Sequence, residues 1–244
     1  MIFETNKQAM ENITKNMSNI KVILVYALLA FGGLWNYLGY FTNLMSVLSG
    51  PMIIIIALYL LYETLNQNLS TTDNAMGKSE SKYKKSFIIF FFFVVISSWF
   101  LEFVGSKTGY PFGVYSYGDV LKPQIMKVPI AIGFAWFSTL IASVGIMQKF
   151  SRINLRLFSP LKKAVIAGAL MTIFDYVLEY AAVNLGYWTW QVGIVPIFNY
   201  IAWFVFGTLF AFIGFKTGVL DSRLPHISHH FYFAQIIFFA LSMV

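Results

Sequence analysis

Three acidic residues lie within or at the end of long apolar stretches, where they are well placed to handle protons. Asp175 and Glu179 belong to one stretch, and Glu102 stands near the end of another. Residues four apart share one face of a helix, so Asp175 and Glu179 would project together. A carboxyl group withheld from water favours its neutral form and can then donate a proton. Ionisable residues inside membrane segments mark functional sites, so we expect Asp175, Glu179 and Glu102 to form a proton-handling cluster.

A structural role is the alternative for these acids. They could form ion pairs with nearby lysines, or cap loops at the membrane surface. The lysines concerned are Lys107, Lys122 and Lys127.

Two segments of the chain repeat each other, and each contains one of the glutamates. The first contains Leu101-Glu102-Phe103, Gly109-Tyr110, Val128-Pro129-Ile130 and Ala135-Trp136-Phe137. The second contains Leu178-Glu179-Tyr180, Gly186-Tyr187, Val195-Pro196-Ile197 and Ala202-Trp203-Phe204. A repeat of this length indicates a duplicated helix–loop–helix unit. We therefore expect Glu102 and Glu179 to face one shared cavity, with loops 105–127 and 185–195 as its outer lid.

The longer of these two loops is rich in aromatic residues. Rings that line an apolar cleft can stabilise a developing carbocation through their faces. The candidates for this role are Tyr110, Phe112, Tyr115 and Tyr117. An aromatic belt at the lipid headgroups is the alternative, and Trp188 and Trp190 of the shorter loop fit that alternative well.

The composition predicts an all-α polytopic membrane bundle of about seven transmembrane helices, built from repeated helix hairpins. Hydrophobic residues make up 58% of the chain and charged residues 11%, which is unlike soluble domains. Apolar runs of about 17–25 residues can cross a bilayer. We expect helices at 21–39, 45–64, 86–104, 128–147, 164–184, 196–216 and a shorter one at 229–244. Residues 1–244 would form one membrane domain: a first hairpin (20–65), a cytoplasmic linker (66–85), a repeated hairpin pair (86–217) and the last helix.

The basic residues predict the orientation of this bundle. All but three of the 17 Lys and Arg residues fall on the side of the N-terminus, the exceptions being Lys107, Lys122 and Lys127. Basic residues favour the cytoplasmic side, so we expect a cytoplasmic N-terminus, an uncleaved first helix and a place in the bacterial inner membrane. The net charge of +7 then reflects topology, and we expect no nucleic-acid partner.

Several chemistries are excluded or disfavoured by residue type. The chain has no cysteine, which excludes disulfides and thiolate metal sites. His226, His229 and His230 resemble one histidine box of a di-iron enzyme, but three histidines in total cannot fill two metal coordination spheres. A single metal held by these three histidines would lie on the cytoplasmic side, away from the acids, so we interpret them as interfacial polar residues. Neither a nucleotide-binding motif nor a lysine in the last helix, as retinal would need, is present. We predict no metal and no cofactor.

The loop and its flanks resemble a known family. The residues that carry the resemblance are Glu102, Gly105, Thr108, Gly109, Pro111, Phe112, Gly113, Tyr115, Tyr117, Leu121, Pro123, Val128, Pro129 and Ile130, with Asp175, Gly186, Trp188, Trp190, Val195, Pro196, Ile197, Asn199, Tyr200 and Trp203. They are similar to the membrane carotenoid hydratases that act on γ-carotene and bisanhydrobacterioruberin, often described only as carotenoid biosynthesis proteins. The resemblance covers about residues 20–220.

The resemblance implies a hydro-lyase that adds water to the terminal double bond of an acyclic carotenoid ψ end group. Its partners would be a lipophilic carotenoid, water and the lipid bilayer. An acid must protonate the alkene, aromatic faces must hold the tertiary cation, and a second carboxylate must direct water. Asp175, Glu179 and Glu102 are then the expected catalytic residues. Tyr110, Phe112, Tyr115, Tyr117, Trp136, Asn199 and Trp203 are the expected substrate-binding residues.

Two other functions remain open. A lycopene-cyclase-type enzyme also begins with alkene protonation, but an internal double bond captures its cation. A carotenoid-binding or transport protein would use repeated helix pairs without chemistry.

Overall fold

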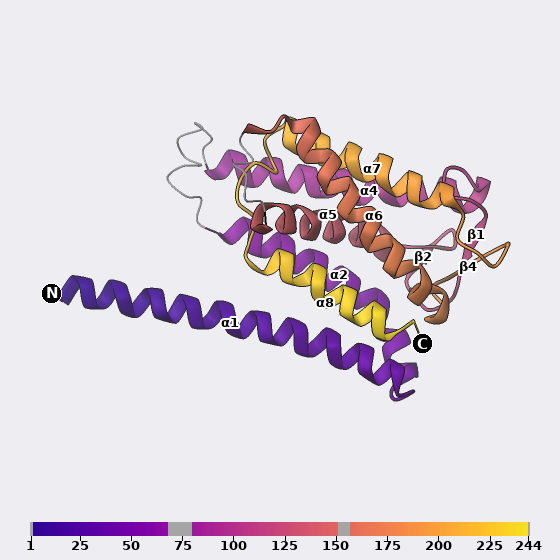
Figure 1. Ribbon diagram of the computed structural model, residues 1–244, viewed down its shortest axis with the longest axis horizontal. Helices are drawn as coiled ribbons and strands as arrows, with labels where there is room; N and C mark the ends of the chain where they lie inside the picture. Colours follow the sequence, from indigo (N-terminus) through magenta and orange to yellow (C-terminus); the bar gives the residue numbers. More distant parts are fainter. Residues whose placement is uncertain (1, 68–79, 151–156, 244) are drawn as a thin grey trace.

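The computed structural model describes residues 2–67, 80–150 and 157–243, with side chains from residue 16 onward. Within these ranges seven helices form a bundle (Figure 1). They are α1 (Ile2–Tyr37), α2 (Thr42–Asn66), α4 (Glu80–Thr108), α5 (Ala131–Phe150), α6 (Pro160–Asn184), α7 (Ile197–Lys216) and α8 (Ile227–Leu241). The predicted all-α membrane fold is confirmed, since six of these helices are long and apolar enough to cross a bilayer. The seventh, α8, has 15 residues.

Several predicted boundaries need correction. Helix α1 begins at Ile2 rather than near residue 21, because the polar turns before the apolar segment continue the same helix. Residues 128–130 precede α5 instead of opening it, because Val128–Pro129 forms a strand. The predicted linker 66–85 lies largely outside the described residues, and its last part, from Glu80, already belongs to α4.

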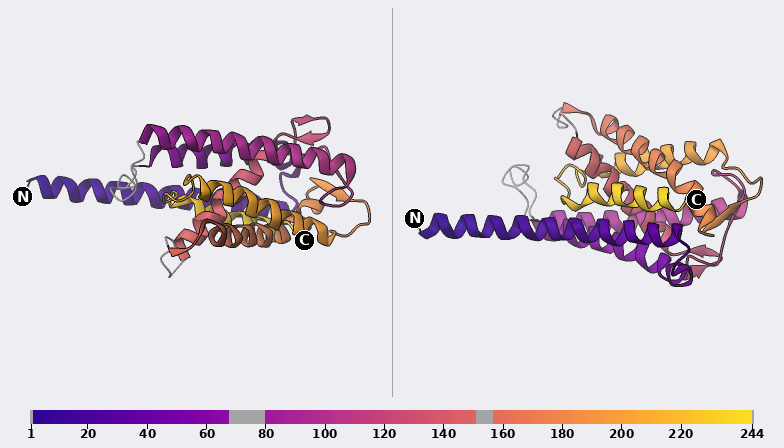
Figure 2. Two further views of the ribbon diagram at one scale, coloured as in Figure 1. Left: turned by 90° about the horizontal axis from the view of Figure 1, so that it is seen from above. Right: turned by 60° about the horizontal axis from the view of Figure 1, so that its bottom comes forward.

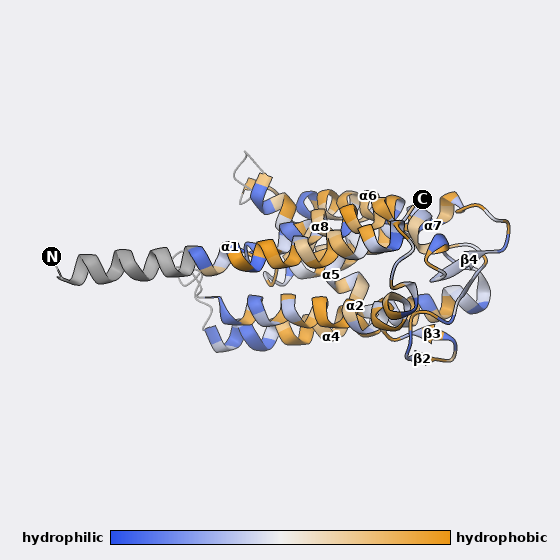
Figure 3. Cartoon of the chain, turned by 90° about the horizontal axis from the view of Figure 1, so that it is seen from below, coloured by the Kyte–Doolittle hydropathy of each residue, from blue (hydrophilic) through white to orange (hydrophobic). Residues whose placement is uncertain are grey.

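The helices alternate in direction, so their connections gather at two ends of the bundle. The N-terminal end of α1 lies at one end; the C-terminus and loops 109–130 and 185–196 lie at the other (Figures 1 and 2). Hydrophobic residues occupy the middle of the helices, and hydrophilic residues are frequent near the ends (Figure 3). This distribution is that of a multi-pass membrane protein.

Helix α5 forms the centre of the bundle and α1 its edge. In the most apolar segment of each helix, 83% of the residues are buried in α5, whereas only 17% are buried in α1. Helix α6 packs along α7, and α1 packs along α8. Glycines allow α6 and α7 to approach closely: a Cβ at Gly168 of α6 would meet Thr208, and one at Gly207 of α7 would meet Met171. Small residues at helix crossings are typical of membrane bundles.

The two loops at the C-terminal end are joined by a small antiparallel sheet. Strand β1 (Tyr115–Tyr117) pairs with β4 (Trp188–Trp190) in the register Tyr115↔Trp190 and Tyr117↔Trp188. Strands β2 (Gln124–Ile125) and β3 (Val128–Pro129) form a second pair within the longer loop. We call the paired strands β1 and β4 the lid, because they tie the two repeat copies together over the end of the helix bundle.

Candidate functional site

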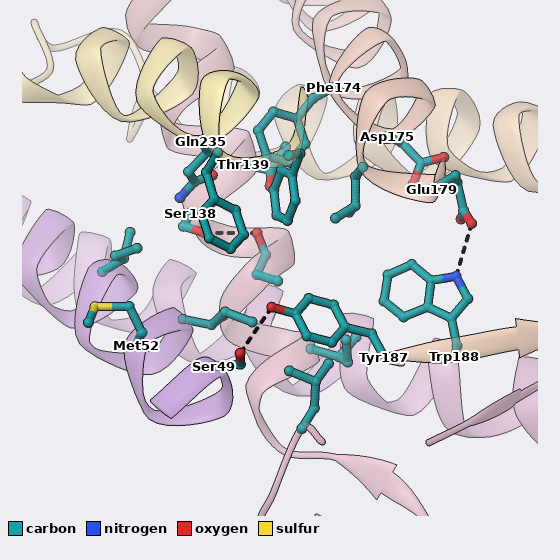
Figure 4. Close-up of a pocket in the computed structure, with 18 of the residues that line it drawn as sticks. Ser49, Met52, Ser138, Thr139, Phe174, Asp175, Glu179, Tyr187, Trp188 and Gln235 are labelled. Atoms are coloured by element: carbon teal, nitrogen blue, oxygen red, sulfur yellow. Dashed lines mark hydrogen bonds between the residues drawn. The ribbon is translucent and has the colours of Figure 1, made fainter. Parts of the chain in front are cut away.

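Beneath the lid lies a cavity of about 210 Å³ that helices from both repeat copies line. Glu102 of α4 and Asp175 and Glu179 of α6 all border it, and their exposed fractions are only 6%, 0% and 2%. The structure thus brings the three predicted acids together around one cavity. Figure 4 shows Asp175 and Glu179 projecting from the same face of α6, one helical turn apart.

The alternative of ion pairs with loop lysines does not describe these acids. Lys122 pairs with Asp119 at 3.7 Å, and the Lys107 amine donates to the carbonyl of Met126. Within the described ranges no ion pair connects a lysine to any of the three buried acids. Their negative charge, where present, is therefore balanced by hydrogen bonds.

Glu102 accepts three hydrogen bonds from its own repeat copy. The indole Nε1 of Trp136 donates to Oε1 at 3.0 Å. The hydroxyls of Tyr115 and Tyr117 both donate to Oε2, Tyr117 at 2.8 Å. Burial, reinforced by the nearby Glu102, raises the pKa of both tyrosine hydroxyls. They therefore remain protonated donors at ordinary pH.

Glu179 is surrounded by N–H donors in a matching arrangement. Trp188 and Trp190 each donate an indole Nε1–H to Oε2 at 2.9 Å, and the Asn199 amide donates to Oε1 at 2.9 Å. An indole nitrogen can donate but cannot accept a hydrogen bond. Both tryptophans are therefore satisfied only if Glu179 Oε2 is an unprotonated acceptor, so a proton on Glu179 can lie only on Oε1.

Asp175 differs from the two glutamates because one of its oxygens has no partner. Asn199 donates to Oδ2 at 2.7 Å through the same amide nitrogen that serves Glu179. Oδ1 is buried without a hydrogen-bond partner. Asp175 also interacts electrostatically with Glu179 and Glu102. A buried carboxyl with one free oxygen beside two other acids can carry a proton and offer it to a molecule in the cavity.

Aromatic rings form much of the cavity wall beside the acids. Trp136 and Trp203 occupy equivalent positions in the two repeat copies, and their rings stack with centroids 4.0 Å apart and planes inclined by 12°. Both tryptophans line the cavity, as do Phe112, Tyr115, Tyr117 and Asn199. Six of the seven predicted substrate-binding residues thus border the cavity.

Tyr110 is the seventh, and the structure places it elsewhere. Its side chain is 77% exposed and does not line the cavity. Gly109 has a φ of +75°. The Thr108 hydroxyl donates to the Tyr110 carbonyl and accepts from the Tyr110 N–H. This tight turn at the end of α4 directs the ring outward.

Trp188 and Trp190 bear on one of the alternatives left open by the sequence. The alternative of an aromatic belt at the headgroups fitted their sequence, but their exposed fractions are 8% and 7% and their indoles donate to Glu179. The alternating spacing of the two residues on strand β4 points both rings to the inner face of the lid. That spacing, together with the glutamate of the same repeat copy, was the signal available in the sequence.

Polar residues of other helices also reach the cavity. The Tyr187 hydroxyl donates to Ser49 of α2 at 3.1 Å (Figure 4), and burial raises the pKa of Tyr187 to about 12. Ser138 and Thr139 of α5 and Gln235 of α8 border the same space. The sequence analysis did not identify these residues. For Gln235, the available signal was an amide side chain within the apolar helix α8.

The three histidines lie at the opposite end of the bundle from the acids. One nitrogen from each of His226, His229 and His230 lies within 4.8 Å of the others. Burial lowers the pKa of His226, and the positive charges of Lys149 and Arg223 lower it further. The same positive charges oppose a bound cation, so the arrangement gives no reason to link these histidines to the chemistry of the cavity.

Comparison with known proteins adds an independent finding. Residues 52–244 match a family described as carotenoid biosynthesis protein. A bisanhydrobacterioruberin hydratase from Haloarcula japonica is 29% identical over 144 residues, which is 54% of this chain and 46% of the relative. The match therefore spans about half the length of that relative. No solved structure matches this chain.

Proposed function

Because this chain belongs to the carotenoid biosynthesis protein family, we propose that it adds water to the terminal double bond of an acyclic carotenoid end group, yielding a tertiary alcohol. The observation that carries the proposal is the combination of a partnerless Asp175 oxygen, two hydrogen-bonded glutamates and stacked tryptophans around one apolar cavity. The similarity to a hydratase of carotenoid metabolism supports the same reaction.

Asp175 is the proton donor in this proposal. Its Oδ1 needs no hydrogen bond to be broken before it reaches a substrate, since it has none. The proton passes from Asp175 to the terminal double bond, leaving a tertiary carbocation and an aspartate. Positioned acids of this kind accelerate proton transfer by roughly 10²–10⁴-fold.

The carbocation is stabilised by the groups that surround it. Glu179 and Glu102 supply negative charge whose position is fixed by three donors each. The stacked rings of Trp136 and Trp203 present aromatic faces, which attract cations. Because these groups are in place before the reaction, little reorganisation accompanies the formation of charge.

Water then adds to the carbocation. The hydroxyl and amide groups of Ser49, Ser138, Thr139 and Gln235 provide hydrogen-bonding positions for water within an otherwise apolar cavity. These polar groups favour hydration over cyclisation, in which an internal double bond captures the cation. As water adds, its extra proton passes to the Asp175 carboxylate, which restores the starting acid without any other reactant.

Pigment analysis in a lycopene-accumulating bacterial host tests the proposal. Hydration gives a product heavier by one or two waters, whereas cyclisation gives an isomer of unchanged mass. Unchanged pigment in the presence of correctly inserted protein would contradict both enzymatic functions and leave binding or transport. The Asp175→Asn variant serves as the matched inactive control.

We also propose that the site lies in the outer half of the bacterial inner membrane. In the sequence, all basic residues except Lys107, Lys122 and Lys127 belong to the N-terminal segment or to the connections and helix ends on the side opposite loops 105–127 and 185–195, and basic segments favour the cytoplasm. A reporter fused within residues 66–85 should read as cytoplasmic, and one within 105–127 as external. The reverse pattern would move the site to the inner half.

A further inference from the structure

A second cavity, of about 280 Å³, continues the first one along the seam between α1 and α2. The two cavities share four lining residues: Leu28 and Leu29 of α1, and Met52 and Ile56 of α2. We call these four residues the junction. Because the same side chains border both spaces, the cavity beneath the lid and the α1–α2 seam adjoin at the junction, and we refer to the two together as the groove.

The seam stays open because α1 packs mainly on α8 and contacts α2 along only a short stretch. In the apolar segments of α1 and α2, only 17% and 22% of the residues are buried, which are the lowest values among the spanning helices. Leu28 is 53% exposed although it lines both cavities. The protein's own side chains therefore do not fill this groove, and an apolar molecule must cover it within a bilayer.

The far end of the groove is polar. Lys21 lines it and forms an ion pair with Glu63 of α2 at 2.6 Å, and Tyr59 lies beside them. Helix α2 covers about 21 Å between Ser49, which borders the catalytic cavity, and Glu63, at 1.5 Å per residue. The groove thus extends from the acids across most of a hydrocarbon core of about 30 Å.

This shape fits one occupant. An acyclic carotenoid is a stiff, nearly straight chain whose length approaches the thickness of the hydrocarbon core, whereas a lipid acyl chain is flexible and reaches only to mid-bilayer. We propose that the α1–α2 seam is the polyene channel of the enzyme: the reacting end lies at Asp175, the conjugated chain passes the junction, and the opposite end group lies near Tyr59 and Lys21. This inference rests on the proposed function for the identity of the reacting end.

The channel also explains why the first hairpin is part of the protein although it supplies none of the three acids. Without α1 and α2 the catalytic cavity would be open to lipid on that side, because Leu29, Met52 and Ile56 form its wall there. The hairpin therefore selects for length and straightness, while the repeat copies perform the chemistry.

Bulky substitutions at the junction test the channel. Met52→Trp and Leu28→Trp should each reduce carotenoid turnover by about tenfold or more, since overfilling an occupied space is unfavourable. Leu58→Trp is the matched control, because Leu58 lies on α2, is 45% exposed and lines neither cavity. Because the Leu28 side chain is about half exposed, the larger ring of Leu28→Trp has room, and the midpoint of thermal unfolding should stay at the parent value.

A binding measurement separates failure of the channel from failure of the proposed reaction. In the Asp175→Asn background, carotenoid that copurifies with the protein is measured by its visible absorbance, with and without Met52→Trp or Leu28→Trp. Loss of pigment with the junction variants, but not with Leu58→Trp, supports the channel even if the parent proves to have no hydratase activity. Normal turnover and normal pigment content in both junction variants would overturn it.

Discussion

The two repeat copies hold equivalent glutamates in equivalent ways, but only the second copy contains a third acid. Glu102 and Glu179 each accept two hydrogen bonds from their own lid strand and one from the following helix. Four residues before each glutamate the copies diverge: Ser98 stands in the first and Asp175 in the second. The partner Asn199 of the second copy corresponds to Ile132 of the first. Duplication thus supplies a symmetric frame, and the Asp175–Asn199 pair adds the asymmetry on which the proposed proton donor depends.

The lid donors differ between the copies as well. Tyrosine hydroxyls serve Glu102, and a hydroxyl can both donate and accept. Indole N–H groups serve Glu179 and can only donate. A lid hydroxyl beside Glu102 can therefore accept a hydrogen bond as well as donate one, whereas no lid group beside Glu179 can accept.

Removing the acid that only the second copy has should produce the largest effect. Asp175→Asn preserves size and the contact with Asn199 but removes the transferable proton, so turnover should fall by roughly 100-fold or more. Pigment conversion by purified protein in detergent measures it, with insertion and unfolding midpoint as controls. Turnover within a factor of a few of the parent would remove Asp175 from the donor role.

The two glutamates should respond unequally to the same substitution. Glu179→Gln brings an amide N–H toward the N–H groups of Trp188, Trp190 or Asn199, leaving at least one buried donor unpaired, which costs about 1–3 kcal/mol. If Asn199 turns its amide to compensate, it withdraws from Asp175. Glu102→Gln can instead donate to the tyrosine hydroxyls and should cost less than about 1 kcal/mol of unfolding free energy.

Chemical unfolding of both glutamine variants measures this difference. Equal destabilisation would mean that the donors of the two lid strands do not distinguish the copies. Turnover of the two variants, measured alongside, should follow the same order.

The asymmetry can also be copied into the first repeat. Ser98→Asp places a carboxyl at the position that corresponds to Asp175, where Ile132 stands in place of the donor Asn199, and should destabilise the protein. Adding Ile132→Asn should then recover about 1 kcal/mol through the new pair, within the range found for coupled neighbours. Ile132→Asn alone is the control. A double variant no more stable than the sum of the single effects would show that the pair needs more than these two residues.

The smallest effect is expected at Tyr110, the aromatic residue that lies outside the cavity. Tyr110→Ala should change stability by no more than about 0.5 kcal/mol and leave turnover at the parent level, as for other exposed positions. Tyr117→Phe, which removes a donor from Glu102, should reduce turnover measurably. A larger effect at Tyr110 than at Tyr117 would reverse the assignment of the loop residues.

Local and repeated patterns made much of this arrangement predictable from the sequence. The apolar runs located the helices, and the repeat placed Glu102 and Glu179 at matching depths. The pairing of β1 with β4 was not predictable, because it joins residues more than 70 positions apart and depends on how the two copies face each other. For the same reason the sequence alone does not distinguish the indole donors Trp188 and Trp190 from interfacial anchors.

The side of the cavity formed by α1, α2 and α8 was also not predicted. Residues such as Met52, Ile56 and Leu29 have the side chains of any lipid-facing helix, so their type does not reveal which helices leave a gap between them. Only the packing of α1 on α8, away from α2, creates that gap.

The lid has a consequence for how the enzyme would meet its substrate. Because β1 and β4 close the end of the cavity that faces water, while the α1–α2 seam opens sideways, a carotenoid would arrive by diffusion within the bilayer. The relevant concentration is then the mole fraction of carotenoid in the membrane, not its amount per volume of buffer. Adding lipid or detergent at a fixed quantity of carotenoid should dilute the substrate in two dimensions and slow the reaction, even though nothing in the aqueous phase has changed.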